Sequence, residues 1–310
     1  MKKLLPYLMI AFGASLWGLI AIFVRELKDA GLTEMEIVTV RVAFASLFLL
    51  LIGGIRYRSQ FAIELRKLPL FFGTGICSIV FFNYCYFSAI NQMNISIAVI
   101  LLYTSPAFVT ILSYLFLKEP LHKRKIGAVM GTIIGCVLIA GMSTGATSNI
   151  TLVGVLTGLG AGLGYALYSI FGKFALEHYK PFTVTLYTFI VATVVLLPFS
   201  SIWGKLDLLL QSKVLLISAS LGLIPTVLAY FVYTWGLEKT ESSKAAIIAT
   251  VEPVVATLVG IVVYQEKMGF VQFLGALLIL MSVIMVNLPG KAERLASMAG
   301  TNKKSTDSVR

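Results

Sequence analysis

Two segments of this sequence, 105–119 and 252–266, share one pattern and differ at one chemically important position. Each has proline at its second position and glutamate at its last, and the residues between them are almost all apolar. The first segment begins with Ser105 and the second, 147 positions later, with Glu252. A carboxyl group next to a proline in an apolar segment can contact a cation, transfer a proton, or hydrogen-bond to the backbone that the proline frees.

Glu252 lies near the middle of its apolar stretch, where an ionised carboxylate is costly. Insertion scales give about 2.5 kcal/mol or more for an acid at the centre of a bilayer. Such a residue either faces a polar cavity or is neutral. Glu252 is therefore a candidate for contact with a substrate cation and for proton coupling. The structural alternative is a neutral carboxyl that hydrogen-bonds to the backbone freed by Pro253.

The two prolines, Pro106 and Pro253, occupy matching positions in these stretches. Each removes one helical hydrogen bond and predicts a kink or a break. Broken helices at the interface between repeats form the substrate sites of many transporters. We expect both prolines to act as hinges beside a central site, and a kink that serves only packing is the alternative.

Other polar and aromatic residues lie within the apolar stretches. Arg41 can extend to lipid headgroups or present its guanidinium to a substrate carboxylate, and Asn83 can hydrogen-bond to a ligand. Tyrosine and tryptophan rings can stack on a substrate or hold a cation, although many such residues only mark the bilayer interface. The candidate cavity residues are Trp17, Arg41, Asn83, Tyr86, Tyr103, Ser105, Tyr165, Tyr168, Tyr187, Tyr230, Tyr233 and Glu252.

The composition requires a bilayer around the elements that position these residues. Of 310 residues, 58% are hydrophobic and 13% are charged, whereas soluble domains have about 45–50% and about 25%. The first apolar run predicts a span and not a cleaved signal peptide, because no small-residue cleavage site follows it. We predict an all-α integral membrane protein with ten transmembrane helices, near 5–24, 37–54, 69–89, 96–117, 126–143, 152–174, 183–201, 214–236, 244–264 and 270–288.

Ten helices divide into two repeats of five. Because five is odd, the second repeat must enter the membrane from the opposite side, so the repeats are predicted to be inverted. The first covers residues 1–145 and the second 150–288. The polar segment 289–310 lacks aromatic residues and predicts a disordered cytoplasmic tail.

The basic residues predict the orientation. With the N-terminus inside, 19 of the 25 Lys and Arg residues fall in inner segments, 5 fall in outer segments, and Arg41 lies within a span. The positive-inside rule therefore favours two cytoplasmic termini. It also explains the net charge of +11 without nucleic acid as a partner.

Two further patterns predict helix contacts. Glu119 and Glu266 end their apolar runs, and each is expected to anchor its helix end by pairing with Lys123 or Lys267. Glycines at four-residue spacing let helix backbones approach closely, and packing within the chain is favoured over a dimer. They are Gly127, Gly131 and Gly135 in the fifth predicted span, and Gly154, Gly158 and Gly162 in the sixth.

The sequence carries none of the motifs that would indicate an enzyme. It has no GxxxxGK[ST] phosphate loop and no HExxH or Cys/His metal cluster. Its two histidines, His122 and His178, lie in predicted loops and offer little for acid–base catalysis. We therefore expect no catalysis, no cofactor and no bound metal.

These features resemble the EamA-type branch of the drug/metabolite transporter superfamily over about residues 5–288. The resemblance rests on the paired repeats, Trp17-Gly18, Arg41, and the two segments from proline to glutamate, followed by Gly275. It implies a cavity formed by spans one to four and six to nine, with spans five and ten outside it. Tyr165 would be the counterpart of Trp17, and Tyr187 roughly that of Arg41.

The resemblance implies a bacterial cytoplasmic-membrane carrier that works by alternating access. The expected activity is export of amino acids or related small metabolites, by a monomer or a homodimer. One alternative is uptake of an organic cation such as a quaternary amine through a tyrosine-lined cavity with Glu252 as the counter-charge. A non-transporting membrane scaffold or membrane enzyme is a further alternative.

Overall fold

The computed structural model describes residues 4–93, 95–140 and 151–287, and these residues are almost entirely helical. The predicted tail, 289–310, lies outside them. The first half contains α1 (Leu5–Gly18), α2 (Ile20–Asp29), α3 (Glu34–Arg56), α4 (Leu68–Phe72), α5 (Phe81–Gln92), α6 (Ile95–Leu102), α7 (Ser105–Phe116) and α8 (Lys123–Ala140). The second contains α9 (Leu152–Leu176), α10 (Pro181–Leu196), α11 (Leu206–Leu209), α12 (Ser212–Gly222), α13 (Ala229–Glu238), α14 (Ser242–Ala249), α15 (Val251–Tyr264) and α16 (Phe270–Asn287).

Short 3₁₀-helical turns and π-helical segments connect or extend these helices. The 3₁₀ turns are η1 (Arg58–Gln60), η2 (Leu65–Lys67), η4 (Leu197–Phe199) and η5 (Ser201–Lys205). Two π-helical segments, η3 (Gly73–Val80) and η6 (Leu223–Leu228), lie at corresponding places in the two halves, just before α5 and α13. They join α4 to α5 and α12 to α13 into long continuous helices.

The described helices are suited to a bilayer. Nine continuous helical stretches among the described residues are long and apolar enough to cross a membrane. The fifth predicted span corresponds to α8, whose 18 residues begin with Lys123, Arg124 and Lys125. The all-helical membrane architecture is therefore confirmed, whereas the count of ten spans and the inverted relation stay predictions.

The two predicted prolines coincide with breaks in the helices. One helix stops at Leu102 and the next starts at Ser105, with Pro106 in its first turn. In the second half α14 stops at Ala249 and α15 starts at Val251, just before Pro253. The threonines at the breaks, Thr104 and Thr250, each donate a hydroxyl hydrogen bond of 2.6 Å to a carbonyl three residues earlier. The two breaks thus use the same residue types, although the threonines are 146 positions apart and the prolines 147.

Helices of one half pack on helices of the other, and two of these pairs, α3 with α10 and α8 with α16, are equivalent helices. The helix α1 packs on α13, and its counterpart α9 packs on α5; α3 meets α10, α7 meets α14, and α8 meets α16. The hydroxyls of Ser46 and Thr193, 147 positions apart, share a hydrogen bond of 2.8 Å. Two residues related by a two-fold rotation can touch only near the rotation axis. This contact is therefore expected at the axis that would relate the two repeats.

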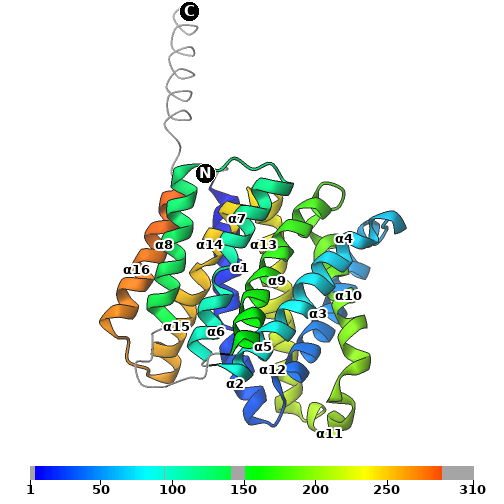
Figure 1. Ribbon diagram of the computed structural model, residues 1–310. Helices are drawn as coiled ribbons and strands as arrows, with labels where there is room; N and C mark the ends of the chain where they lie inside the picture. The colour runs from blue at the N-terminus through cyan, green and yellow to red at the C-terminus, as the bar shows by residue number, and fades with distance from the viewer. Residues whose placement is uncertain (1–3, 94, 141–150, 288–310) are drawn as a thin grey trace, which may run out of the picture.

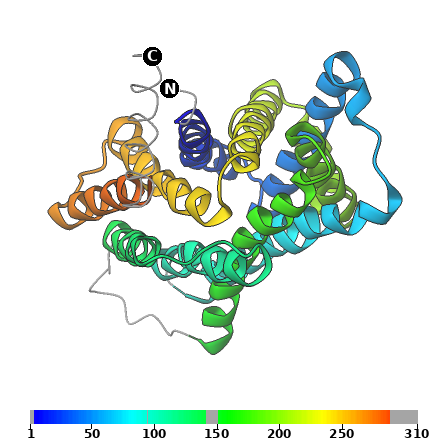
Figure 2. The ribbon, with the colours of Figure 1, turned by 90° about the horizontal axis from the view of Figure 1, so that it is seen from above.

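The glycine stripes lie at helix contacts within the chain, as predicted. A Cβ on Gly135 would come within 2.8 Å of the Gly275 carbonyl oxygen, and one on Gly158 within 2.5 Å of Leu101. Figure 1 and Figure 2 both place α8 and α16 side by side at one edge of the bundle. The backbones of α8 and α16 can approach this closely because glycine has no side chain.

Candidate functional site

A cavity of about 510 Å³ extends from the middle of the bundle to one end. We call this end, which carries Glu34, Glu266 and Gln272, the open end, and the other, which carries Leu4 and Glu119, the closed end. In Figure 1 the open end lies at the bottom and the closed end at the top. A volume of this size suits a small metabolite.

Glu252 lies on the cavity wall in the first turn of α15. The Tyr165 hydroxyl donates a hydrogen bond of 2.9 Å to Glu252 Oε2. The first span passes very close to this turn, because a Cβ on Gly18 would lie 2.9 Å from the Glu252 carbonyl oxygen. The Trp17-Gly18 pair therefore has a clear local purpose: glycine allows the approach, and tryptophan reaches the cavity beside the acid.

Arg41 supplies the opposite charge. It lies on α3, is 7% exposed, and lines the same cavity. Its Nε is buried and has no hydrogen-bond partner among the described residues, and the indole Nε1 of Trp17 is in the same condition. Buried donors are normally paired, so two unpaired donors on one cavity wall indicate a place for an acceptor from a ligand.

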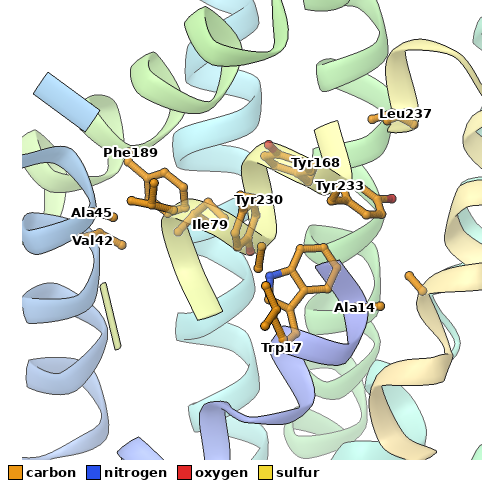
Figure 3. Close-up of a cluster of buried hydrophobic side chains, with 14 of the residues drawn as sticks. Ala14, Trp17, Val42, Ala45, Ile79, Tyr168, Phe189, Tyr230, Tyr233 and Leu237 are labelled. Carbon is orange, nitrogen blue, oxygen red and sulfur yellow. The ribbon is translucent and has the colours of Figure 1, made fainter. Parts of the chain in front are cut away.

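Aromatic rings form the inner limit of the cavity. The Trp17 ring lies 4.9 Å from Tyr230 and 6.1 Å from Tyr165, measured between centroids in edge-to-face arrangements. Figure 3 shows Trp17, Tyr230, Tyr233 and Tyr168 gathered in one cluster. This cluster separates the cavity from the closed end.

Tyr168 and Tyr233 form a second layer behind Trp17. The Tyr168 hydroxyl shares a 2.7 Å hydrogen bond with Thr234, and the Tyr233 hydroxyl shares one of 2.7 Å with Ser169. The space among these side chains is only about 10 Å³. Both tyrosines are therefore packing residues of the barrier in this conformation and lie off the cavity wall.

The structure brings nine of the sequence-predicted residues to one cavity. They are Trp17, Arg41, Asn83, Tyr86, Tyr103, Tyr165, Tyr230, Glu252 and Pro253. The Asn83 side-chain nitrogen donates to the Ile79 carbonyl at 2.7 Å, so one of its two N–H donors is already used within its own helix.

Four predicted residues besides Tyr187 lie away from this cavity. Ser105 and Pro106 are buried at the start of α7, on the side of the closed end, where helices are packed together. Tyr168 and Tyr233 lie in the barrier described above. Glu252 and Pro253 line the cavity whereas Ser105 and Pro106 do not, because the cavity opens at only one end.

Tyr187 is distant from the cavity lining. Its hydroxyl donates to the Phe61 carbonyl at 2.6 Å, and its ring packs on Phe71 at 5.1 Å. The residue 147 positions after Arg41 is instead Thr188, which is fully buried and bonded to Thr74 at 2.7 Å. Pairing Arg41 with Tyr187 was off by one residue, and one residue turns a side chain by about 100° around a helix.

The sequence interpretation also missed part of the wall. Cys136, Ile139 and Ala140 of α8 and Gln272 of α16 line the cavity near the open end, although spans five and ten were expected to lie outside it. No described residue of α10, in the seventh predicted span, lines it. Apolar lining residues have no sequence signal that separates them from lipid-facing ones.

The predicted ion pairs at the helix ends are partly wrong. Glu119 lies 3.7 Å from Lys125 and not beside Lys123, because α8 turns Lys125 toward the interior, where it is 3% exposed. Among the described residues there is no cluster of three His, Cys, Asp or Glu side chains that could hold a metal ion.

Comparison with known proteins identifies relatives over nearly the whole chain. The model of the EamA-like transporter family matches residues 4–141 and again 152–288. An uncharacterized transporter of Archaeoglobus fulgidus is 28% identical, in an alignment that covers 92% of this chain and 99% of that transporter. Uncharacterized transporter YwfM of Bacillus subtilis is 25% identical, in an alignment that covers 74% of this chain and 77% of YwfM.

A solved crystal structure has the same fold. It superposes with a TM-score of 0.75 at 17% identity and covers 93% of this chain and 97% of the other. At this identity the likeness concerns the arrangement of the helices.

Proposed function

Because this chain belongs to the EamA-like transporter family and is a multi-pass membrane protein, we propose that it exports amino acids or closely related zwitterions. The single observation that carries this proposal is the pair of opposite charges, Arg41 and Glu252, on the wall of one cavity. An amino acid carries a carboxylate and an ammonium group, and each would meet its complement there.

The carboxylate would be bound by Arg41 and Trp17. Both have a buried nitrogen without a hydrogen-bond partner among the described residues. A substrate carboxylate would satisfy both donors, and charge-assisted hydrogen bonds of this kind contribute about 1.5–3 kcal/mol.

The ammonium group would be bound by Glu252. Tyr165 holds one carboxylate oxygen, which fixes the orientation of the acid. The rings of Trp17 and Tyr230 would then contact the substrate's side chain or lie against its positive charge. Glu252 is also the residue we propose for proton coupling, because it is an acid in the substrate cavity.

The predicted orientation gives the described conformation a place in an export cycle. If the termini are cytoplasmic, as the basic residues predict, the open end faces the outside of a bacterial cell. The described conformation is then the one that releases an exported substrate. Alternating access would return the cavity to the other side by motion at the two broken helices near Pro106 and Pro253.

The second candidate function is uptake of an organic cation. The aromatic rings around Glu252 favour it, since a quaternary amine binds to ring faces beside a carboxylate. The buried guanidinium of Arg41 opposes it, because a cation lacking a carboxylate would approach an uncompensated positive charge.

Binding to purified protein separates the two. Thermal unfolding would be measured with neutral amino acids, with the corresponding amines that lack the carboxylate, and with quaternary amines. We expect stabilisation by amino acids only, and Arg41→Gln to weaken it by about tenfold or more. Stabilisation by quaternary amines that persists in Arg41→Gln would overturn the proposal in favour of the cation carrier.

Transport into proteoliposomes tests the coupling. We expect Glu252→Gln to remove the pH dependence of amino-acid transport. Unchanged rate and unchanged pH dependence in this variant would exclude coupling at Glu252.

A further inference from the structure

The closed end is held by a carboxylate that caps a helix from the other half. Glu119 is 8% exposed and accepts hydrogen bonds from the backbone N–H of Ser242 and, at 3.1 Å, of Ser243, and from the Ser243 hydroxyl. These residues begin α14. A carboxylate at a helix N-terminus satisfies backbone donors that have no partner within the helix.

The turn that presents Glu119 has a specific form. After α7, Lys118 adopts the left-handed conformation with φ 55°, and the Glu119 N–H donates to the Ser113 carbonyl at 3.1 Å. A left-handed residue directly after the last helical turn is a common way for a helix to end. It turns the chain so that Glu119 projects from the end of α7 toward α14.

The same turn occurs at the open end, 147 positions later. Gln265 is left-handed with φ 57°, and the Glu266 N–H donates to the Gly260 carbonyl at 3.1 Å. The helix corresponding to α14 is α6, in which Ser96 stands where Ser243 stands. Here, however, Glu266 lines the cavity. The open end thus contains a ready-made turn whose glutamate faces the cavity.

A second pair of residues repeats this difference. At the closed end the Lys173 ammonium donates to the carbonyls of Leu237 and Glu238, which end α13, and of Thr240 just beyond it. The register that pairs Trp17 with Tyr165 pairs Arg25 with Lys173. At the open end Arg25 instead lies over the Tyr264 ring, 4.3 Å from its centroid.

We propose that Glu266 and Arg25 are gate residues that close the open end in the opposite conformation. Glu266 would cap α6 at its first backbone N–H groups and Ser96, as Glu119 caps α14. Arg25 would leave Tyr264 and bind the carbonyls at the end of α5, the counterparts of those that hold Lys173. This inference rests on the alternating access of the proposed function and adds the residues that perform it.

The two gates differ in strength. Lys125, 4% exposed at its side chain, stands 3.7 Å from Glu119, whereas its counterpart 147 positions later is the neutral Gln272. A glutamate that closes the open end would therefore lack a buried ammonium beside it. This difference favours the described conformation, with the end that has the stronger gate closed.

Two matched probes report the two ends. Thr257 lines the cavity, and its counterpart Thr110, 7% exposed, is buried in α7. Each would be changed to cysteine in full-length protein in which Cys77, Cys85 and Cys136 are replaced by alanine. Labelling by a water-soluble maleimide is measured on purified protein, where both ends are accessible to reagent.

The variants have opposite expected effects. Glu119→Gln weakens the closed gate, so labelling at Thr110→Cys should rise by about tenfold, equivalent to about 1.4 kcal/mol between the two conformations. Glu266→Gln should lower labelling at that probe by a similar factor, and Gln272→Lys should raise it. The double variant Glu119→Gln/Glu266→Gln should return it toward the parent value.

The gate proposal is overturned if Glu266→Gln and Gln272→Lys both leave labelling at the two probes unchanged in protein that elutes as a folded species. It is also overturned if Glu266→Gln changes labelling in the same direction as Glu119→Gln. Because no substrate is needed, failure of the proposed amino-acid transport leaves this result valid. Failure of the gate likewise leaves amino-acid binding at Arg41 intact.

Discussion

The closed and open ends of this bundle are made from corresponding residues in different arrangements. At the closed end, Glu119 caps a helix of the other half and Lys173 binds three carbonyls. At the open end, their counterparts Glu266 and Arg25 face the cavity and an aromatic ring. One set of parts therefore has two arrangements, which is what a protein needs to expose a central site to each side in turn.

The two halves differ chemically where they line the centre. Glu252 lies in the cavity, and its counterpart Ser105 is packed at the closed side. Arg41 lies in the cavity, and Thr188 at the matching position is bonded within the packing. A symmetric frame thus holds an asymmetric site, and the asymmetry would keep one substrate orientation in both conformations.

The largest expected effect separates Glu252 from Ser105. We predict that Glu252→Gln lowers the amino-acid transport rate by about 100-fold, because a charge-assisted contact of about 1.5–3 kcal/mol is lost. Ser105→Ala should lower it by less than about threefold. Initial rates in proteoliposomes test both, with equal incorporation as the control. Similar losses in the two variants would break the comparison between the halves.

The next effect concerns stability at the two ends. Glu119→Ala removes a buried acceptor and should lower the free energy of unfolding by about 3 kcal/mol, as is usual when one partner of a buried ion pair is removed. Glu266→Ala, at the cavity, should lower it by less than about 0.5 kcal/mol. Thermal unfolding in detergent measures both. Equal destabilisation would mean that the two glutamates are equally engaged in the described state.

A smaller effect is expected at the contact between counterparts. Ser46→Ala and Thr193→Ala should each lower the free energy of unfolding by about 1 kcal/mol, and the double variant should lose little more than either alone. Because the contact joins matching residues, it should be kept in both conformations. The labelling ratio of the two cysteine probes should therefore stay unchanged, and a shift in that ratio would contradict this placement.

The smallest effect involves Glu241 at the closed end. Burial raises the pKa of Glu241, but the ammonium groups of Lys125 at 2.8 Å and Lys244 at 3.0 Å hold it below its ordinary value of 4.5. A lowered pKa contributes stability that is present above the ordinary pKa and is lost as pH falls through the folded-state value.

Glu241→Gln should therefore destabilise the protein by less than about 1 kcal/mol near neutral pH, since the carboxylate is partly exposed. The difference in unfolding temperature from the parent should disappear at acidic pH. A difference that stays constant down to strongly acidic pH would show that the ion pairs do not cause it.

Much of this architecture could be predicted from local signals. The paired segments from proline to glutamate predicted the helix breaks, because proline removes a backbone donor wherever it occurs. Glu252 and Arg41 were predicted to face a cavity, since charges in apolar segments need a polar environment. Both line it.

Other features depended on contacts across the fold. Tyr187 and Tyr168 have the same residue type as Tyr165 but lie off the cavity wall. Tyr187 is on a helix that packs elsewhere, and Tyr168 is nearly one turn further along α9, where its hydroxyl bonds to Thr234. The contribution of Cys136 and Gln272 to the wall was not predictable, because apolar and neutral residues do not indicate which neighbour they face.

The sequence by itself determined a membrane protein made of two repeats, with one charge inside an apolar segment of each, Arg41 in the first and Glu252 in the second. It did so through composition and spacing, which act locally and need no knowledge of neighbours. Only the tertiary structure decided which end is open, and with it which of two corresponding glutamates caps a helix. That choice depends on small differences in packing free energy between two arrangements, such as the ammonium of Lys125 beside Glu119, and no single segment contains it.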